Sequence, residues 1–156
     1  MIRACGSLAA LGLTVLALGA QASCIVLAPQ ADGGAPLARI AVDERDGRFR
    51  IAYIHSVTRT PVEERYFVDG ARIVQTEIRF VQHGPGLPTA ADAGGSFAHR
   101  DGMFVVAGRR SFDEVVMRVH ADQQPRLVAG ASSVDLAGWG NRAIVMRARA
   151  GRCPAP

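Results

Sequence analysis

Short runs of β-branched and aromatic residues recur along the whole chain and are separated by Gly, Asp and Pro. No amphipathic helical pattern continues for more than two turns. Runs of this kind, bounded by turn residues, are typical of strands. The pattern predicts about ten strands, near residues 25–28, 37–42, 48–57, 62–68, 71–82, 103–107, 114–120, 126–129, 133–136 and 142–149. We therefore expect an all-β fold, an antiparallel β-sandwich or a partly closed barrel of about 8–10 strands.

One long segment, 83–102, carries no strand pattern. It contains the turn-forming residues Gly84, Gly86 and Pro88 and, further on, two adjacent glycines. A loop of this length in a small domain is either mobile or functional. The segment is a poor phosphate cradle, because its prolines lack the N–H donors that such a loop uses.

The N-terminus has the pattern of a secretory signal peptide. A single early charge, Arg3, precedes an apolar run over residues 8–20 and the small-x-small sequence Ala20-Gln21-Ala22. We expect residues 1–22 to be removed, which leaves 156 − 22 = 134 residues, 23–156, as a single domain with its core over about 24–149. This predicts an exported, periplasmic protein.

Two other fates of this N-terminal segment stay open. Residues 8–28 are together long enough to cross a bilayer, so an uncleaved segment would anchor the protein in the inner membrane. Lipid attachment at Cys24 is the third alternative. It is disfavoured because Gln21 stands where a lipoprotein signal normally has a leucine-like residue.

Cleavage would leave two cysteines, Cys24 and Cys153, one near each end of the domain. Two cysteines in an exported chain favour a disulfide, which would staple the two termini together. Metal binding by these thiols is less favoured, because neither has a Cys or His at ligand spacing.

All 18 basic side chains are arginine. A chain without lysine has no Schiff-base lysine, no pyridoxal-phosphate anchor and no phosphate-loop lysine. The arginines of the second half are not interleaved with aromatic residues, so the sequence does not predict nucleic-acid binding. The four histidines lack paired ligand spacing, and we therefore expect no metal and no cofactor.

Two hairpins are predicted between residues 48 and 82. The dipeptide Asp69-Gly70 indicates a two-residue turn that would place Val68 opposite Ala71, Tyr66 opposite Ile73 and Glu64 opposite Gln75. A four-residue loop over 58–61 would place Val57 opposite Val62, His55 opposite Glu64, Tyr53 opposite Tyr66 and Ile51 opposite Val68. Both registers put the same residues on one face.

The polar end of that face is the predicted binding site. It would gather His55, Glu64, Gln75 and Glu77, with Arg79 on the same side of its strand. Residues opposite each other on one face lie about 5 Å apart, so the imidazole and the first carboxylate would share a hydrogen bond. The alternative is a polar pair that only fixes strand register.

His55 and Ser56 do not form a catalytic pair in this prediction, because adjacent strand residues point to opposite faces. Ser56 and Thr58 are expected to bond turn backbone groups, and Pro61 to stiffen entry into the next strand. A hydrolase would need another base for the serine.

The residues His55-Ser56-Val57, then Thr60-Pro61-Val62-Glu63-Glu64, then Gly84-x-Gly86-Leu87-Pro88 resemble a bacterial family catalogued as domain of unknown function 1850. The resemblance covers roughly residues 24–149 and is strongest over 49–88. It implies a small exported or membrane-anchored protein, often encoded beside tripartite ATP-independent periplasmic (TRAP) transporters of the TAXI type. No established activity comes with it.

The expected function is therefore that of a non-enzymatic accessory domain of a TRAP uptake system, touching its solute-binding protein, its permease or a substrate. An alternative is a binder of small organic acids that uses the polar corner, with residues 83–102 as a lid. A hydrolase built on Ser56 or His55 is the third hypothesis, and it requires a nucleophile, a base and an orienting group together.

Overall fold

The computed structural model describes residues 23–31, 34–43 and 45–154, so the predicted signal peptide lies outside the described residues. The described strands are β1 (Ser23–Pro29), β2 (Ala38–Val42), β3 (Arg48–Ile54), β4 (Pro61–Asp69), β5 (Arg72–Phe80), β6 (Ser96–Arg100), β7 (Met103–Phe112), β8 (Glu114–Val119), β9 (Arg126–Ala129), β10 (Ser132–Asp135) and β11 (Arg142–Ala150). Two short 3-10 turns, η1 (Ala121–Gln123) and η2 (Ala137–Trp139), join the later strands. Within these ranges no helix is long and apolar enough to cross a bilayer.

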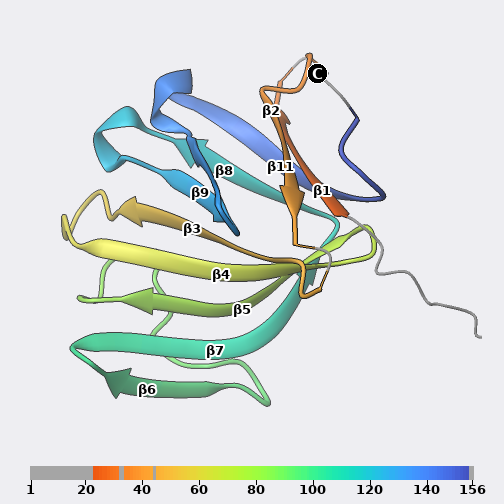
Figure 1. Cartoon of the computed structure of the whole chain (residues 1–156). Helices are drawn as coiled ribbons and strands as arrows, with labels where there is room; N and C mark the ends of the chain where they lie inside the picture. The colour runs from red at the N-terminus through yellow and green to blue at the C-terminus, as the bar shows by residue number, and fades with distance from the viewer. Residues whose placement is uncertain (1–22, 32–33, 44, 155–156) are drawn as a thin grey trace, which may run out of the picture.

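Two antiparallel sheets make a sandwich, which confirms the all-β prediction. The smaller sheet has the strand order β2-β1-β11-β8, and the larger has the order β10-β9-β3-β4-β5-β7-β6 (Figure 1). β7 ends in the larger sheet at Phe112 and β8 begins in the smaller one at Glu114, so the chain changes sheet at Asp113.

The main core lies between the two sheets. Alternate residues of each strand point inward, as Ile25 and Leu27 do on β1 and Phe49 and Ile51 do on β3, and all four are buried. The fully buried Ile144 of β11 faces the same core. We call the side of the larger sheet that faces this core its inner face, and the opposite side its outer face.

A disulfide between Cys24 and Cys153 joins the two ends of the domain, as predicted. Cys24 is paired with Arg149 across β1 and β11, and Cys153 follows just beyond the end of β11. The bridge therefore closes the chain over a sequence separation of 129 residues.

The prediction that 83–102 is wholly irregular is wrong, because residues 96–100 form the edge strand β6, paired with β7. Phe97 is the one large apolar residue in that range, which is too little of a pattern to identify a strand from sequence. The remaining part, residues 81–95, we call the strap. It carries the buried Leu87 into a second apolar cluster with Val62, Phe80 and Val106, on the part of the inner face that the smaller sheet does not cover.

Candidate functional site

The predicted register between β3 and β4 is wrong by four residues. Glu64 pairs with Ile51 rather than with His55, and Val62 pairs with Tyr53. The strands end earlier than expected because the chain already turns at His55, whose N–H donates to the carbonyl of Thr60. The imidazole and the Glu64 carboxylate therefore belong to different parts of the domain.

The second hairpin is displaced by two residues. Asp69 pairs with Arg72, so the central turn residues are Gly70 and Ala71. Gly70 has a positive φ of 61°, and glycine at the first central position is what a type II′ hairpin turn requires. A displacement of two keeps the side chains between the turn and Gln75 on their predicted faces but brings Gln75 opposite Tyr66 instead of Glu64.

Glu64 and Gln75 nevertheless meet, in a half-buried polar cluster on the inner face. Glu64 accepts hydrogen bonds from the Tyr53 hydroxyl at 3.0 Å, from the Tyr66 hydroxyl, and from Gln75 Nε2 at 3.3 Å. Burial, followed by the negative charge and hydrogen bond of Glu64, raises the pKa of both phenols far above the usual value of 10.0. The two tyrosines therefore stay protonated donors, and the carboxylate has three partners within the protein.

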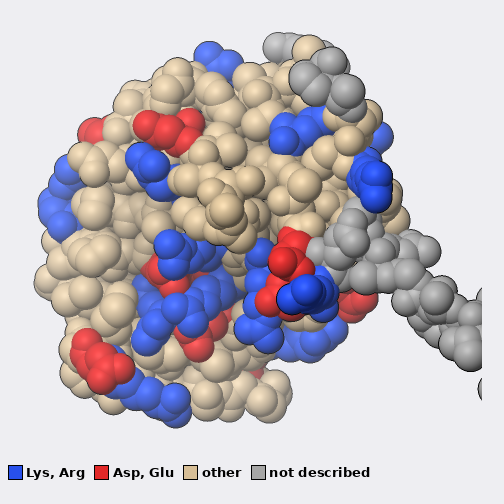
Figure 2. Space-filling view, viewed as in Figure 1, with Lys and Arg blue, Asp and Glu red and all other residues tan. Residues whose placement is uncertain are grey.

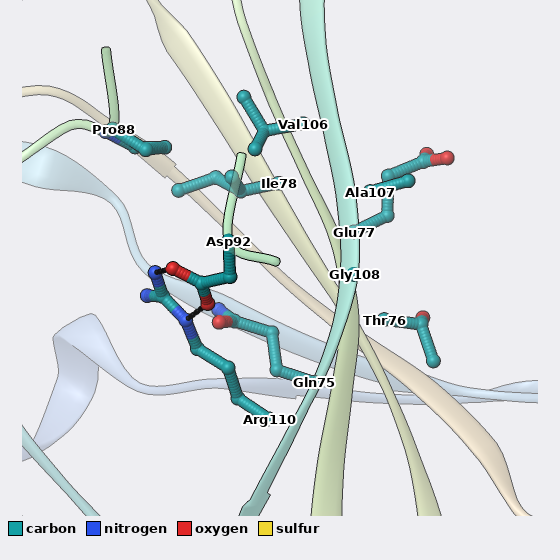
Figure 3. A pocket seen from close by; sticks show the side chains of 10 residues that line it. All are labelled: Gln75, Thr76, Glu77, Ile78, Pro88, Asp92, Val106, Ala107, Gly108 and Arg110. Atoms are coloured by element: carbon teal, nitrogen blue, oxygen red, sulfur yellow. Dashed lines mark hydrogen bonds and ion pairs between the residues drawn. The ribbon is translucent and has the colours of Figure 1, made fainter. Parts of the chain in front are cut away.

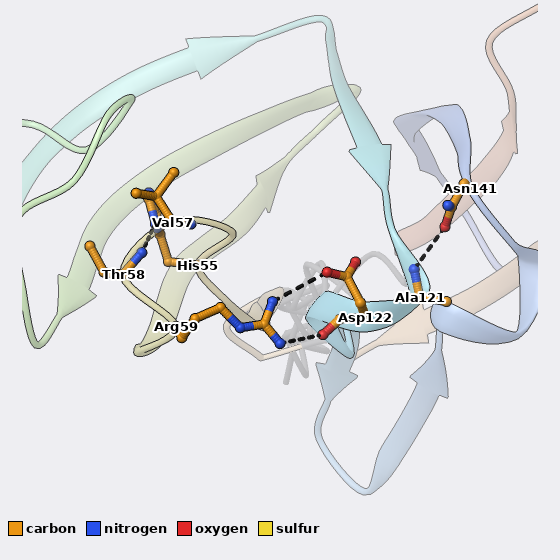
Figure 4. A network of polar contacts seen from close by, with 7 residues as sticks. All are labelled: His55, Val57, Thr58, Arg59, Ala121, Asp122 and Asn141. Atoms are coloured by element: carbon orange, nitrogen blue, oxygen red, sulfur yellow. Dashed lines mark hydrogen bonds and ion pairs between the residues drawn. The ribbon is translucent and has the colours of Figure 1, made fainter.

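His55 is buried, with 6% of its surface exposed, and holds the turn rather than a ligand (Figure 4). Its Nδ1 accepts hydrogen bonds from the backbone N–H groups of Val57 and Thr58 at 3.2 and 3.1 Å. Nε2 then carries the proton and donates to the carbonyl of Pro85 in the strap at 3.1 Å. Both ring nitrogens are thus engaged with backbone.

The other turn residues of the prediction surround this ring. Ser56 is exposed, and among the described side chains no hydrogen bond joins it to a histidine. The hydroxyl groups of Thr58 and Thr60 lie 2.8 Å apart, and Pro61 begins β4. Gly84 packs so closely that a Cβ there would lie 2.6 Å from the His55 ring.

Arg59 ties the same turn to η1. Its guanidinium donates to the carboxylate and to the backbone carbonyl of Asp122, at 3.2 Å each (Figure 4). Arg59 has a positive φ of 55°, so it is a left-handed non-glycine residue inside the turn. The turn that follows β3 is therefore held by two contacts, one from His55 to the strap and one from Arg59 to η1.

Glu77 and Arg79, which the sequence placed in the polar corner, lie on the outer face. Glu77 Oε1 is 3.6 Å from Arg79 Nε and 3.4 Å from Arg65 Nη1. Glu63 joins the same row, 2.6 Å from Arg65 Nε and 3.5 Å from Arg50 Nη1. Arginine and glutamate thus alternate across β3, β4 and β5, and the row carries one positive charge in excess.

The outer face is also hollowed into an open groove of about 920 Å³. Arg48, Arg50, Arg65 and Arg109 line it, with Phe67 between them. The Arg109 guanidinium lies 4.8 Å from the centre of the Phe67 ring. Figure 2 shows the arginines clustered with carboxylates where Figure 1 draws β4 and β5. We call this feature the arginine groove.

Sequence reasoning missed the arginine groove. The signal was present, because Arg48 and Arg50 stand on either side of Phe49 on one strand, and Glu63 and Arg65 occupy alternate positions on the next. On any single strand, however, charged residues on the solvent face are common and do not indicate a groove. Only the observed register brings arginines from three strands, β3, β4 and β7, around one hollow.

A smaller cavity, of about 30 Å³, lies between the strap and the inner face (Figure 3). Asp92 of the strap closes it by accepting two hydrogen bonds from Arg110 of β7, one from Nη2 at 2.7 Å and one from Nε. The hydrogen bond from Arg110 lowers the pKa of Asp92 below its ordinary value of 3.8. The carboxylate is therefore ionised at neutral pH.

Within the described residues, no group of three or more His, Cys, Asp or Glu is arranged to hold a metal ion. A family model described as "Domain of unknown function (DUF1850)" matches residues 49–136, which is more than half of the chain. No curated protein and no solved structure matches. The matched range runs from Phe49 in β3 to the end of β10, and it holds the His55 turn, the Glu64 cluster, the strap and most of the arginine groove.

Proposed function

The chain belongs to the DUF1850 family, and on that premise we propose that it is an exported, non-enzymatic accessory domain of a TAXI-type TRAP uptake system that binds an organic acid in the arginine groove. The observation that supports the ligand part of this proposal is the arginine groove. It is large enough for a small ligand, and its charged lining consists of four arginines against Asp46 and Glu77.

Carboxylates are the anions that planar guanidinium groups bind best, through paired N–H donors. Arg50 makes one ion-pair contact, at 3.5 Å, and Arg109 makes one, at 3.2 Å. Each guanidinium has several N–H groups, so donors remain that can face the groove. Because the arginines come from separate strands around Phe67, the arrangement suits an acid with two carboxylates.

The proposed setting rests on other observations. A disulfide between the chain ends is typical of proteins in oxidising compartments, which supports export to the periplasm. Family members are often encoded beside TRAP transporters, which supports the role in uptake. The Glu64 carboxylate and both ring nitrogens of His55 are hydrogen-bonded within the protein, which favours a structural role for both residues.

Binding of succinate, followed by calorimetry, tests the ligand part of the proposal. Arg50→Gln removes one arginine of the groove, and Arg147→Gln is its matched control. Both arginines lie on strands, pair with a glutamate, and have side chains about half exposed, 48% and 52%. A hydrogen bond to a charged group contributes about 1.5–3 kcal/mol, so we expect R50Q to weaken binding about tenfold or more. Equal affinities of the two variants would refute the groove as the site.

The accessory role is tested separately by pull-down. We expect the exported form to retain the co-encoded solute-binding protein or permease, and a strain that lacks the gene to take up less substrate. No association, together with unchanged uptake, would overturn the accessory role and leave the question of succinate binding open to the calorimetry.

A further inference from the structure

We propose that the cavity beneath the strap is a second binding site, specific for a short-chain monocarboxylate, and that Asp92 occupies it as an internal substitute for the ligand. The site is distinct from the arginine groove, because it lies on the inner face and uses a different arginine. Three features of the described residues carry this inference.

The first is the contact between Asp92 and Arg110. The guanidinium holds the Asp92 carboxylate through Nε and Nη2, which is the paired geometry by which arginine recognises a free carboxylate. The Asp92 side chain is a carboxymethyl group and therefore has the size and charge of acetate. Gln75 reaches toward this ion pair (Figure 3). Its Nε2 donates a hydrogen bond to Glu64 at 3.3 Å.

The second feature is the space behind the ion pair. The cavity of about 30 Å³ has room for a water molecule or two. Ile78, Val106 and Pro88 line it on the side where the Asp92–Arg110 pair lies, whereas Thr76 and Glu77 point away (Figure 3). If Asp92 withdraws, a carboxylate can take its place on the guanidinium, and the apolar residues can cover a tail of roughly two to four carbon atoms.

The third feature is the way the strap is attached. Gly94, two residues after Asp92, has a positive φ of 79°, which glycine adopts without steric strain. The strap is held separately at its other end by the Pro85 carbonyl on His55 and by the buried Leu87. The ion pair is exposed on both sides, at 51% and 52%, so it can open without unpacking the apolar cluster.

A tethered carboxylate competes with a free one at a high effective concentration. Asp92→Asn removes the competing charge but keeps the size of the side chain, so we expect it to bind propionate at least tenfold more tightly than the unchanged protein. Binding is followed by amide chemical shifts in a propionate titration. Asp122→Asn is the matched control, because it also breaks an exposed Asp–Arg pair at a loop, and we expect the affinity of the unchanged protein.

Two further variants test the site itself in the Asp92→Asn background. Arg110→Gln removes the guanidinium and should abolish binding. Arg50→Gln should have no effect, which separates this site from the arginine groove.

The proposal is overturned if Asp92→Asn binds propionate no better than Asp122→Asn, if binding is undetectable in every variant, or if it survives Arg110→Gln. Propionate shifts confined to Arg50 and Phe67 would also overturn it, because they would place the acid in the arginine groove.

Discussion

His55→Ala is expected to lower the free energy of unfolding by about 3 kcal/mol. The ring makes three hydrogen bonds to backbone groups, two through Nδ1 and one through Nε2. Each contributes about 1 kcal/mol net, and partners left unsatisfied in a buried place add to the loss. Because the ring joins the 55–60 turn to the strap, we expect its removal to have a large effect on stability.

Urea unfolding at neutral pH measures this loss. His99→Ala is the control, because that ring is exposed on the edge strand β6, and we expect a change below about 0.5 kcal/mol. His55→Asn should recover part of the loss, since an asparagine side-chain oxygen can accept a hydrogen bond from the backbone two residues ahead but is too short for Pro85. A loss below 1 kcal/mol for His55→Ala, equal to that of the control, would refute the structural role of this ring.

Three further predictions follow from other contacts. Replacing both Cys24 and Cys153 by serine should lower the free energy of unfolding by about 4–5 kcal/mol in urea, from the entropy of a loop of 129 residues; a loss under 1 kcal/mol would contradict this. Tyr53 and Tyr66 are the two tyrosines of the chain, and their raised pKa means that the stability they contribute is complete below pH 10 and is lost as pH rises further. Absorbance at alkaline pH should therefore show no tyrosinate until the protein unfolds, and a normal titration near pH 10 in the folded state would show the pKa shifts to be wrong. Gly84→Ala should cost about 1–3 kcal/mol in the same unfolding assay, because its Cβ would lie 2.6 Å from the His55 ring; Gly138→Ala, whose Cβ meets nothing, is the control, and equal stabilities would count against the close contact.

The fold could be predicted largely from alternation along single strands. Runs such as 62–68 and 142–149 keep a mainly apolar face, and each forms a strand. The predicted strands are wrong where tertiary contacts, rather than local sequence, determine where a strand forms or ends. β6 has Phe97 as its one large apolar residue, and the ends of β3 and β4 are set by the turn at His55.

The candidate site could be predicted only in part, for the same reason. Face assignments survived the two-residue displacement of the second hairpin, so Glu64 and Gln75 do meet. Two bulges, between Arg65 and Tyr66 and between Gln75 and Glu77, then place Glu77 on the other face. Bulges add a residue to one strand without a mark in the sequence pattern. Predicting the arginine groove would require the register of several strands at once.

The proposed function is tested most directly by observing the arginines themselves. Every basic side chain of this protein is arginine, so a spectrum of the guanidinium Nε–H groups reports on all its cationic side chains. On addition of succinate, we predict that the signals of Arg48, Arg50, Arg65 and Arg109 shift together and saturate, while that of Arg147 stays in place. Shifts that are absent, or that are spread evenly over the arginines of both sheets, would contradict the assignment of the groove as an organic-acid site.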